Sequence, residues 1–401
     1  MPKRKRVNAY GRYAENRKVI SLFSGAMGLD IGMQKAGLDV VIGQDFDAAC
    51  VETMKANGHA VLGGDIRDIN PQMLLSITGM AVGEPFMICG GPPCQPFSTA
   101  GKRLGINDPR GSLFMDFIRM IDYIRPRFFV MENVKGIMSA PLKHVSSDER
   151  DDNDPDQKLG TVLDVILSEF NELGYKTVYG LLDAVNYGVP QFRERFVLIG
   201  SRDGEDIFLP FPTHFQMHQD AEFRWKTVGE AIKDLENDPG ECGTFSEERK
   251  KYVHMVPEGG NWRNLPKDII PIAMGGAYKS GGGKVGFYRR LSYSQPSPTI
   301  TTAPAQKATM LCHPTQDRPL SVKEYARIQQ FPDGWIFRGT TSSKYKQIGN
   351  AVPIGLAKAI GEAVISTADK ESIIETKRYR GTSIHNRIKN AIELGGYDGT
   401  Y

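Results

Sequence analysis

The sequence lacks long apolar runs, is poor in cysteine and has no marked excess of charge of either sign. Its longest apolar stretches, such as FFVM and FVLIG, are far shorter than the ~20 residues of a membrane-spanning helix. The basic start MPKRKR is not followed by an apolar segment, so we expect neither a secretory signal nor membrane association. The 5 cysteines form no CxxC pair and no spacing of zinc-ligand type, which predicts a reduced, cytoplasmic protein without a metal site.

The near balance of charge leaves a nucleic-acid partner open. The 50 basic and 47 acidic side chains give a net charge of +3, which neither demands nor excludes such a partner. Residues 269–316, however, contain no aspartate or glutamate, and this stretch indicates nucleic-acid binding better than the net charge does. A basic loop region without a ligand would look the same. The cations of the stretch are Lys279, Lys284, Arg289, Arg290 and Lys307.

The length and composition are typical of a folded protein with two domains, with 40% hydrophobic and 24% charged residues in 401. Strand-like and helix-like segments alternate through the first half, which predicts an α/β fold with a doubly wound parallel sheet. After residue 205 this alternation fades, and proline, glycine, threonine and aromatic residues become more frequent. We therefore expect a larger domain at 1–205 completed by 340–401, a smaller irregular domain at 206–316 and a hinge segment at 317–339. The acidic segment 144–158 is expected to be a solvated surface loop.

Polar features follow the first three predicted strands. Gly25 and Gly28 in SLFSGAMGLD would let the backbone approach a ligand at a helix N-terminus, although a tight structural turn has the same spacing. Asp45 and Phe46 end the second strand, where a carboxylate can bind ribose hydroxyls and a ring can stack on a purine. Asp65 follows the third strand and could accept from an adenine amino group. Each acid alone could be a helix cap, but together the three strand ends favour a nucleoside cofactor.

The segment GGPPCQPFS carries a candidate nucleophile. Its glycines and prolines fix an irregular backbone, and Cys94 lies at the exit of an apolar strand. A cysteine inside a sheet is an inert hydrophobe, whereas one at the carboxyl end of a strand can act as a nucleophile. The long loop that follows carries Lys102, Arg103 and Arg110 and could close over an anionic substrate.

Two further motifs supply an acid and two cations. Glu132 in MENV ends the next apolar strand, where partial burial would raise the pKa of its carboxyl and let it donate a proton. A helix-capping glutamate is the alternative. Arg193 and Arg195 in QFRER share one strand face, which suits a carbonyl oxygen or phosphates. Alternatively, these arginines could have a purely structural role in a surface ion pair with Glu194.

A thiol, an acid and two arginines around a nucleoside crevice resemble the DNA (cytosine-5) methyltransferases, especially the bacterial restriction-modification enzymes. The resemblance spans roughly residues 19–365 in the family's order. It implies a Rossmann-like catalytic domain that binds S-adenosylmethionine and a target-recognition domain at 206–316. The matching motifs are SLFSGAMGL, GDI, GGPPCQPFS, RGSLF, MENV, QFRERF, RPLSVKEYARIQQFPDGW and YKQIGNAVP.

The resemblance also implies a role for each catalytic candidate. Cytosine C5 is a poor nucleophile, and addition of the Cys94 thiolate at C6 would make it able to attack a methyl sulfonium. Glu132 would bond N3 and the exocyclic amine, Arg195 would hold O2, and Arg193 would support the loop or the base. The target cytosine must flip out of the duplex to reach Cys94.

S-adenosylmethionine is the implied donor and S-adenosylhomocysteine the product. Two departures from the family pattern concern its binding: Met27 stands where a glycine is usual, and Asp45–Phe46 where Glu–Trp is usual. Both changes are chemically mild. By resemblance the pocket would include Phe23, Gly25, Gly28, Leu29, Asp45, Phe46, Asp65, Ile66, Pro92, Leu113, Asn350 and Val352.

The implied partner is double-stranded DNA, bound by a monomer that could be paired with a cognate restriction endonuclease. Arg289 or Arg290 could read a guanine, and either could equally anchor a phosphate. A tRNA cytosine-5 methyltransferase of the same fold is the alternative reaction. A nucleotide-binding oxidoreductase would leave PPCQ, ENV and RER unexplained. The closing loop would contribute Gln95, Ser98, Lys102 and Arg103 to DNA binding.

Overall fold

A computed structural model describes residues 17–93, 113–142, 154, 157–279 and 285–369. These residues form two compact units. Unit 1 contains the described residues up to Asp183, Glu194–Pro212, and the chain from Leu356 onward. Unit 2 contains Ala184–Arg193 and Thr213–Gly355. The expected boundaries at 206, 316 and 340 differ from this division, because residues 184–193 and 317–355 group with unit 2.

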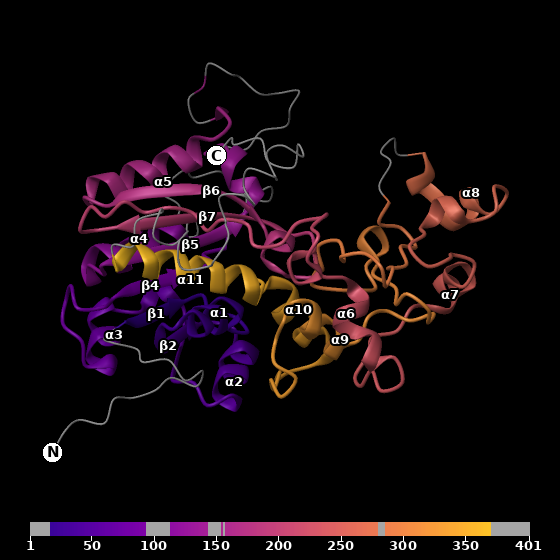
Figure 1. Ribbon diagram of the computed structural model, residues 1–401, viewed down its shortest axis with the longest axis horizontal. Coiled ribbons are helices and arrows are strands. Elements are labelled where there is room, and N and C mark those ends of the chain that lie inside the picture. Colours follow the sequence, from indigo (N-terminus) through magenta and orange to yellow (C-terminus); the bar gives the residue numbers. More distant parts are fainter. Residues whose placement is uncertain (1–16, 94–112, 143–153, 155–156, 280–284, 370–401) are drawn as a thin grey trace. The chain divides into compact units, whose positions relative to one another are not determined.

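The core of unit 1 is a seven-stranded sheet with the order β3-β2-β1-β4-β5-β7-β6 (Figure 1). The first five strands pair in parallel, whereas β7 runs antiparallel to both β5 and β6. The predicted doubly wound α/β fold is therefore confirmed, with one reversed strand near an edge. The strands are β1 (Lys18–Leu22), β2 (Asp39–Asp45), β3 (Val61–Gly63), β4 (Met87–Gly90), β5 (Phe128–Val134), β6 (Lys176–Asp183) and β7 (Glu194–Ser201).

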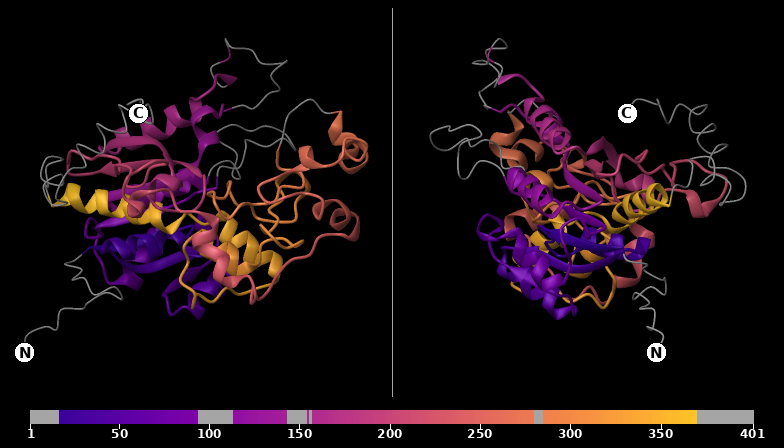
Figure 2. Two further views of the ribbon diagram at one scale, coloured as in Figure 1. Left: turned by 45° about the vertical axis from the view of Figure 1, so that its right-hand side comes forward. Right: turned by 90° about the vertical axis from the view of Figure 1, so that its left-hand side faces the viewer.

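Helices cover both faces of this sheet. Ile20 and Leu22 of β1 face an apolar cluster that α3, α4 and α5 share. Since side chains alternate along a strand, Ser21 points to the opposite face, where α1 packs against α11. Figure 2 shows α11 running along the sheet. The helices of unit 1 are α1 (Gly28–Ala36), α2 (Ala48–Ala56), α3 (Pro71–Thr78), α4 (Leu113–Ile124) and α5 (Thr161–Glu172), and α11 (Ile354–Ala368) begins two residues before the unit boundary.

Local sequence explains where these helices begin and end. Asn70 caps α3 through a bond from Gln72 N–H, and Pro71 fills the first helical position, where no amide donor is needed. Gly79 then ends α3 in a left-handed conformation. The buried side chains of α4 recur every three or four residues, which places one apolar face on the sheet.

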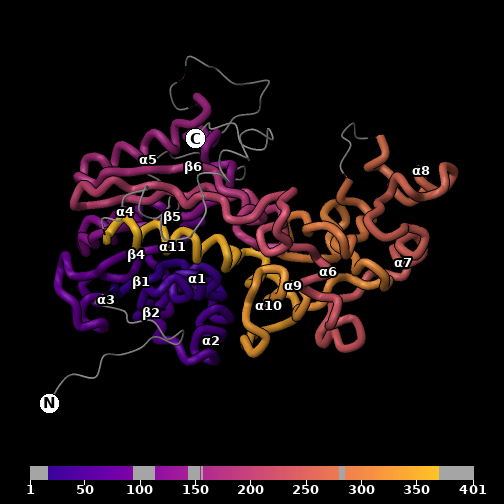
Figure 3. The backbone as a smooth tube through the Cα atoms, in the orientation of Figure 1, coloured from indigo at the N-terminus to yellow at the C-terminus, as the bar shows by residue number. Residues whose placement is uncertain are grey.

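Unit 2 is built from short helices joined by long irregular segments, as the backbone trace shows (Figure 3). Its described residues pair only through isolated β-bridges. A separate apolar cluster that includes Phe245, Val253 and Met310 forms its core. The helices are α6 (Val228–Ile232), α7 (Glu247–Val253), α8 (Ile270–Met274), α9 (Val322–Ile328) and α10 (Thr341–Asn350).

One helical stretch among the described residues, Thr341–Ala368, is long and apolar enough by length and composition to cross a bilayer. Of its most apolar window, 67% lies buried inside the protein. Burial of this kind is also found in the core helices of proteins that span no membrane.

Candidate active site

The carboxyl ends of the parallel strands of unit 1 gather most of the predicted site residues at one edge of the sheet. In a doubly wound fold this edge is where ligands bind. The loop after β1 reaches α1 through three positive backbone angles, with φ of 54° at Phe23, 55° at Gly25 and 70° at Met27. Apart from the chain neighbours of Gly25, no atom of the described residues lies within 4 Å of the position that a Cβ on Gly25 would occupy, so these residues leave space beside the loop.

Asp45 ties this loop to the end of β2. Its carboxylate accepts from the N–H groups of Gly25 and Asp47, both at 2.8 Å, and only 8% of the residue is exposed. Burial raises the pKa of Asp45, and the backbone hydrogen bonds counteract that rise. The next residue, Phe46, is 67% exposed, so its ring is available for stacking.

The segment after β3 is stabilised by an arginine side chain. Asp65 caps a short 3₁₀ helix at Ile66–Asp68 and accepts from Arg67 Nε at 2.9 Å. Hydrogen bonds from Arg67 lower the pKa of Asp65 to about 2, so this carboxylate stays charged at neutral pH. Ile66 is buried, and Leu113 packs at the rim of the apolar cluster.

An acid and a cation face each other across β5 and β7. Val134 pairs with Arg195 in the antiparallel register, which puts Arg195 diagonally opposite Glu132. Arg195 Nε lies 2.9 Å from Glu132 Oε1, and both side chains are about nine-tenths buried. Burial lowers the pKa of Arg195, and the charge of Glu132 opposes that shift. The predicted acid and one predicted arginine therefore form a buried ion pair.

The strand exit that leads to the candidate nucleophile lies directly beside this pair. A Cβ on Gly91 would lie 3.0 Å from Glu132 Oε2, a tight contact that any larger residue here would force on the carboxylate. Asn133 Nδ2 donates to the carbonyl of Pro92 at 2.8 Å and fixes the segment to β5. Asn133 is not among the residues predicted from the sequence, although its signal is an amide that follows Glu132 on an otherwise apolar strand. Cys94 follows two residues after Pro92.

Six predicted residues lie outside the part of the chain that the structure describes. These are the nucleophile candidate Cys94 and the loop residues Gln95, Ser98, Lys102, Arg103 and Arg110.

Arg193 belongs to unit 2 and is bonded to the backbone there. It is 2% exposed and donates to the carbonyls of Ile300 at 3.0 Å, Gly349 at 2.6 Å and Ala351 at 3.2 Å. Its guanidinium thus holds the residues around Asn350, the exposed last residue of α10, and Val352, which is buried. This is a different role from the contact with a reacting base or a closing loop that the sequence predicted.

The two candidate guanine readers differ in exposure. Arg290 is 4% exposed, so a base-reading role does not fit its position. Arg289 is half-buried and donates through Nε to the carbonyl of Met310 at 3.2 Å. Burial lowers the pKa of Arg289. The guanidinium of Arg290 donates to the carbonyls of Val253, Val256, His313 and Gln316 and pairs with Asp317.

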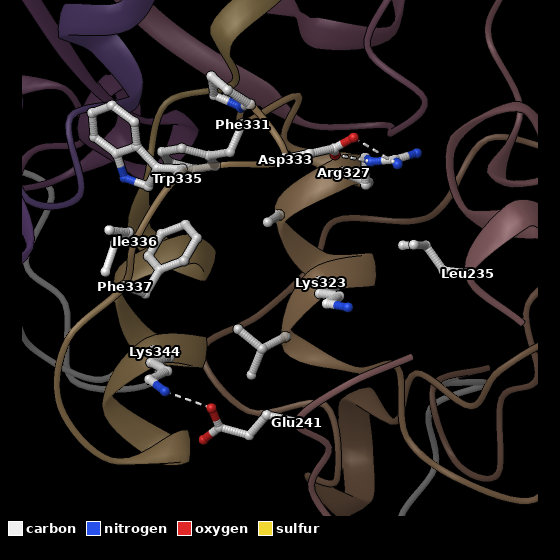
Figure 4. A pocket seen from close by; sticks show the side chains of 13 residues that line it. Leu235, Glu241, Lys323, Arg327, Phe331, Asp333, Trp335, Ile336, Phe337 and Lys344 are labelled. Carbon is white, nitrogen blue, oxygen red and sulfur yellow. Dashed lines mark hydrogen bonds and ion pairs between the residues drawn. The ribbon is translucent and has the colours of Figure 1, made fainter. Parts of the chain in front are cut away.

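A cavity of about 490 Å³ in unit 2 holds none of the predicted site residues. It lies beside α9 and α10 and has an aromatic wall that includes Phe331 and Trp335 (Figure 4). Its charged groups pair within the protein, as Lys344 does with Glu241 at 2.5 Å. Since the cavity contains none of the predicted site residues, the site described above remains the stronger candidate.

Residues 17–366 match the family described as C-5 cytosine-specific DNA methylase. The chain belongs to this family. It is 37% identical over 363 residues to the Type II methyltransferase M.Eco47II of Escherichia coli, covering 88% of this chain and 79% of that protein. It is 36% identical over 356 residues to M.Sau96I of Staphylococcus aureus, covering 88% and 77%. These matches identify the chain as a cytosine-C5 DNA methyltransferase.

Solved structures agree with the methylase fold. One is a DNA modification methyltransferase encoded within a prophage of E. coli, with a TM-score of 0.60, 22% identity, and coverage of 88% of this chain and 99% of that one. Another is the Dnmt2 methyltransferase of S. pombe, with a TM-score of 0.54, 16% identity, and coverage of 88% and 99%. At such identities the likeness concerns the fold alone.

Proposed function

We propose that this methyltransferase transfers a methyl group from S-adenosylmethionine to C5 of a cytosine flipped out of a short, specific duplex DNA site. The observation that carries the proposal is the buried Glu132–Arg195 ion pair next to the Gly91–Pro92 strand exit. An acid beside a cation can bond the N3 edge and O2 of one pyrimidine ring, and Cys94 follows closely enough in sequence to attack that ring.

The residues at the sheet edge fit the donor. The backbone at Gly25 leaves open space, Asp45 has carboxylate lone pairs beyond its two backbone bonds, and Phe46 exposes its ring. When bound, S-adenosylmethionine supplies an electrophilic methyl group. Asp45 would hold the ribose hydroxyls, Phe46 would stack on the adenine, and Asp65 would accept from the adenine amino group.

The proposed reaction cycle needs only the side chains of this protein and its two substrates, DNA and S-adenosylmethionine. The Cys94 thiolate forms a bond to cytosine C6, and Glu132 assists by donating a hydrogen bond or proton at N3. The electron-rich C5 then takes the methyl group, which leaves S-adenosylhomocysteine. Loss of the C5 proton to solvent, return of the N3 proton to Glu132 and expulsion of the thiolate from C6 restore the ring and the enzyme. No metal ion takes part in this proposal.

The first prediction tests the whole cycle. Fluorine at C5 cannot leave as a cation, so an enzyme acting on 5-fluorocytosine stalls after methyl transfer, still bonded through Cys94 to C6. Duplex DNA that carries the site with this base, mixed with S-adenosylmethionine, is expected to give an adduct that survives a denaturing gel. Cys94→Ser is expected to give none, because a hydroxyl is a far weaker nucleophile than a thiolate at neutral pH.

Two controls separate this cycle from its alternatives. The four other cysteines, Cys50, Cys89, Cys242 and Cys312, lie outside the PPCQ segment, and their replacement should leave trapping intact. A parallel reaction with tRNA distinguishes the alternative substrate. An adduct mapped by mass spectrometry to another cysteine, or rapid methylation by Cys94→Ser, would overturn the mechanism.

The proposal includes the setting in which the enzyme works. We propose that it acts as a monomer on DNA in the cytoplasm and that it protects sites cut by a cognate restriction endonuclease. The relatives M.Eco47II and M.Sau96I carry the designation Type II methyltransferase, which supports the restriction-modification setting. Within the basic stretch, Arg289 is proposed to contact the duplex, whereas Arg290 is proposed to hold the core of unit 2.

A further inference from the structure

A buried glutamine at the end of β2 connects two loops of unit 1. Gln44 is 1% exposed, although its strand is otherwise largely apolar. Its side-chain Nε2 donates to the carbonyl of Gly64 at 2.7 Å, and its Oε1 accepts from Phe23 N–H at 3.4 Å. Its backbone N–H donates to Ser24 Oγ at 3.2 Å, and its carbonyl accepts from Ser24 N–H at 2.9 Å. Every polar group of this residue therefore bonds to one of the two loops.

The backbone positions that the Gln44 amide holds have unusual conformations. Phe23 has φ of 54°, a left-handed angle that is unfavourable for a bulky side chain. Gly64 has φ of 140°, a value that glycine alone adopts readily. Such conformations persist where surrounding bonds fix them. The amide of Gln44 supplies one such bond at each position.

Phe23 and Gly64 each lie next to residues that we assign to the cofactor site. Phe23 opens the loop that contains Gly25, and Gly64 directly precedes Asp65. The residue after Gln44 is Asp45, whose carboxylate accepts from Gly25 N–H. At the polar end of β2, the side chains of Gln44 and Asp45 thus both bind the loop after β1. The side chain of Gln44 also binds the loop after β3.

We infer that Gln44 is a positioning residue for the donor pocket, whose side-chain amide sets the spacing between the loop after β1 and the loop after β3. The inference rests on the proposed function, because it takes these two loops as walls of the S-adenosylmethionine site. Gln44 itself is buried beneath them and acts through the backbone of Phe23 and Gly64.

The second prediction compares two replacements of this amide in the full chain. Gln44→Met keeps the approximate shape but bonds neither loop, whereas Gln44→Glu keeps the acceptor for Phe23 N–H and places a carboxylate against the Gly64 carbonyl. Calorimetry with S-adenosylmethionine and S-adenosylhomocysteine should show binding weakened about three- to tenfold for Gln44→Met. The loss should be larger for Gln44→Glu, because two acceptors then face each other. At saturating donor, kcat should stay within about twofold of the wild type, since the reacting groups are untouched.

Gln316 provides a matched control in unit 2. Its amide also bridges two segments, donating to the carbonyl of Glu236 at 2.9 Å and accepting from Arg318 Nε at 2.6 Å. Gln316→Met should lower thermal stability in the absence of ligand without changing donor affinity. Wild-type donor affinity in Gln44→Met, or an equal loss of affinity in Gln316→Met, would overturn the positioning role. Failure of the wild-type protein itself to bind the donor would instead refute the proposed function, and this inference with it.

Discussion

At the scale of single residues, the ion pair between Glu132 and Arg195 fixes the position of the acid that the proposed reaction uses. Arg195 holds Glu132 in one orientation at 2.9 Å, and the Gly91 backbone passes close to the same carboxylate. A carboxyl group fixed in this way can, once it is protonated, donate to a ring nitrogen without reorganising.

The third prediction follows from this geometry. Glu132→Gln keeps the shape and one hydrogen-bonding edge but removes the ionisable proton. We expect donor and DNA affinities close to those of the wild type and a chemical step slower by about 10²-fold or more, measured in single-turnover reactions.

Glu194→Gln serves as the control for that variant. Glu194 lies beside Arg195 in the chain but pairs with Lys135 at the surface, where the exposed fractions of the two side chains are 47% and 63%. An exposed pair contributes little, so this variant should react at the wild-type rate. Equal single-turnover rates in Glu132→Gln and Glu194→Gln would remove Glu132 from the mechanism.

Another carboxyl, on α1, is fully buried, and no described residue forms a salt bridge with it. Asp30 is 0% exposed, and burial raises its pKa to about 7, with Ser21 and the Asp30 backbone lowering it and Asp45 adding to the rise. The folded protein therefore keeps the proton over a pH range in which the unfolded chain loses it. The contribution of Asp30 to the free energy of unfolding falls as pH rises from about 4 to about 7, because folding takes up a proton at this group in that window.

The fourth prediction isolates this effect. Asp30→Asn keeps an uncharged side chain of the same shape, so the free energy of unfolding should depend less on pH between about 4 and 7 than in the wild type. Each unit by which the pKa is displaced corresponds to about 1.4 kcal/mol. Urea unfolding at several pH values measures the slope. The exposed control Asp122→Asn should leave the slope unchanged, and an unchanged slope in Asp30→Asn would show that Asp30 is charged in the folded protein.

At the scale of elements, the end of α10 shows how a helix terminus is completed by distant residues. The last carbonyls of a helix have no partner within it. Here Arg193 bonds the carbonyls of Gly349 and Ala351, while Gln329 Nε2 donates to those of Ile348 and Ala351. A cation at this end also suits the negative pole of the helix.

The fifth prediction is that Arg193 contributes mainly to stability. Arg193→Met leaves buried carbonyls without donors, which should lower the free energy of unfolding by about 2–4 kcal/mol. Arg224 is an exposed arginine that bonds a single neighbouring loop through the carbonyl of His218, and Arg224→Met should cost far less. An Arg193→Met protein that is as stable as the wild type yet defective in the chemical step would assign Arg193 to catalysis.

Which site elements could be predicted depended on how local their signals are. The strand ends at Asp45, Asp65 and Glu132 follow from alternation of apolar strands with polar ends, and the structure places them at one edge of the sheet. Arg193 shows the limit. Its acceptors lie 107 to 158 positions away in the chain and are backbone carbonyls, which have no signature in the sequence.

At the scale of the whole molecule, the sheet was predictable, and the expected domain boundaries differ from the two compact units. Alternating strands and helices specify a doubly wound sheet, whereas the order of its strands and the reversal of β7 are known from the structure. Residues 184–193 and 317–355 group with unit 2 through contacts such as Arg193 with the carbonyl of Ile300 at 3.0 Å and Lys323 with Asp238 at 3.2 Å. Gln44 could not be predicted from the sequence, because a single amide in an apolar strand forms no recurring pattern. Its role depends on the two loops that it contacts.

The packing of α11 against α1 has a consequence for biosynthesis. A Cβ on Gly32 of α1 would lie 2.3 Å from Ala357 Cβ, so the first helix of unit 1 is shaped to fit its last. All of unit 2 except Ala184–Arg193 is translated between β7 and α11. While the ribosome makes those residues, the face of the sheet that α11 will cover remains exposed, although domains otherwise tend to fold in order of synthesis. A nascent chain of this methyltransferase is thus a natural client for chaperones until residue 368 has left the exit tunnel.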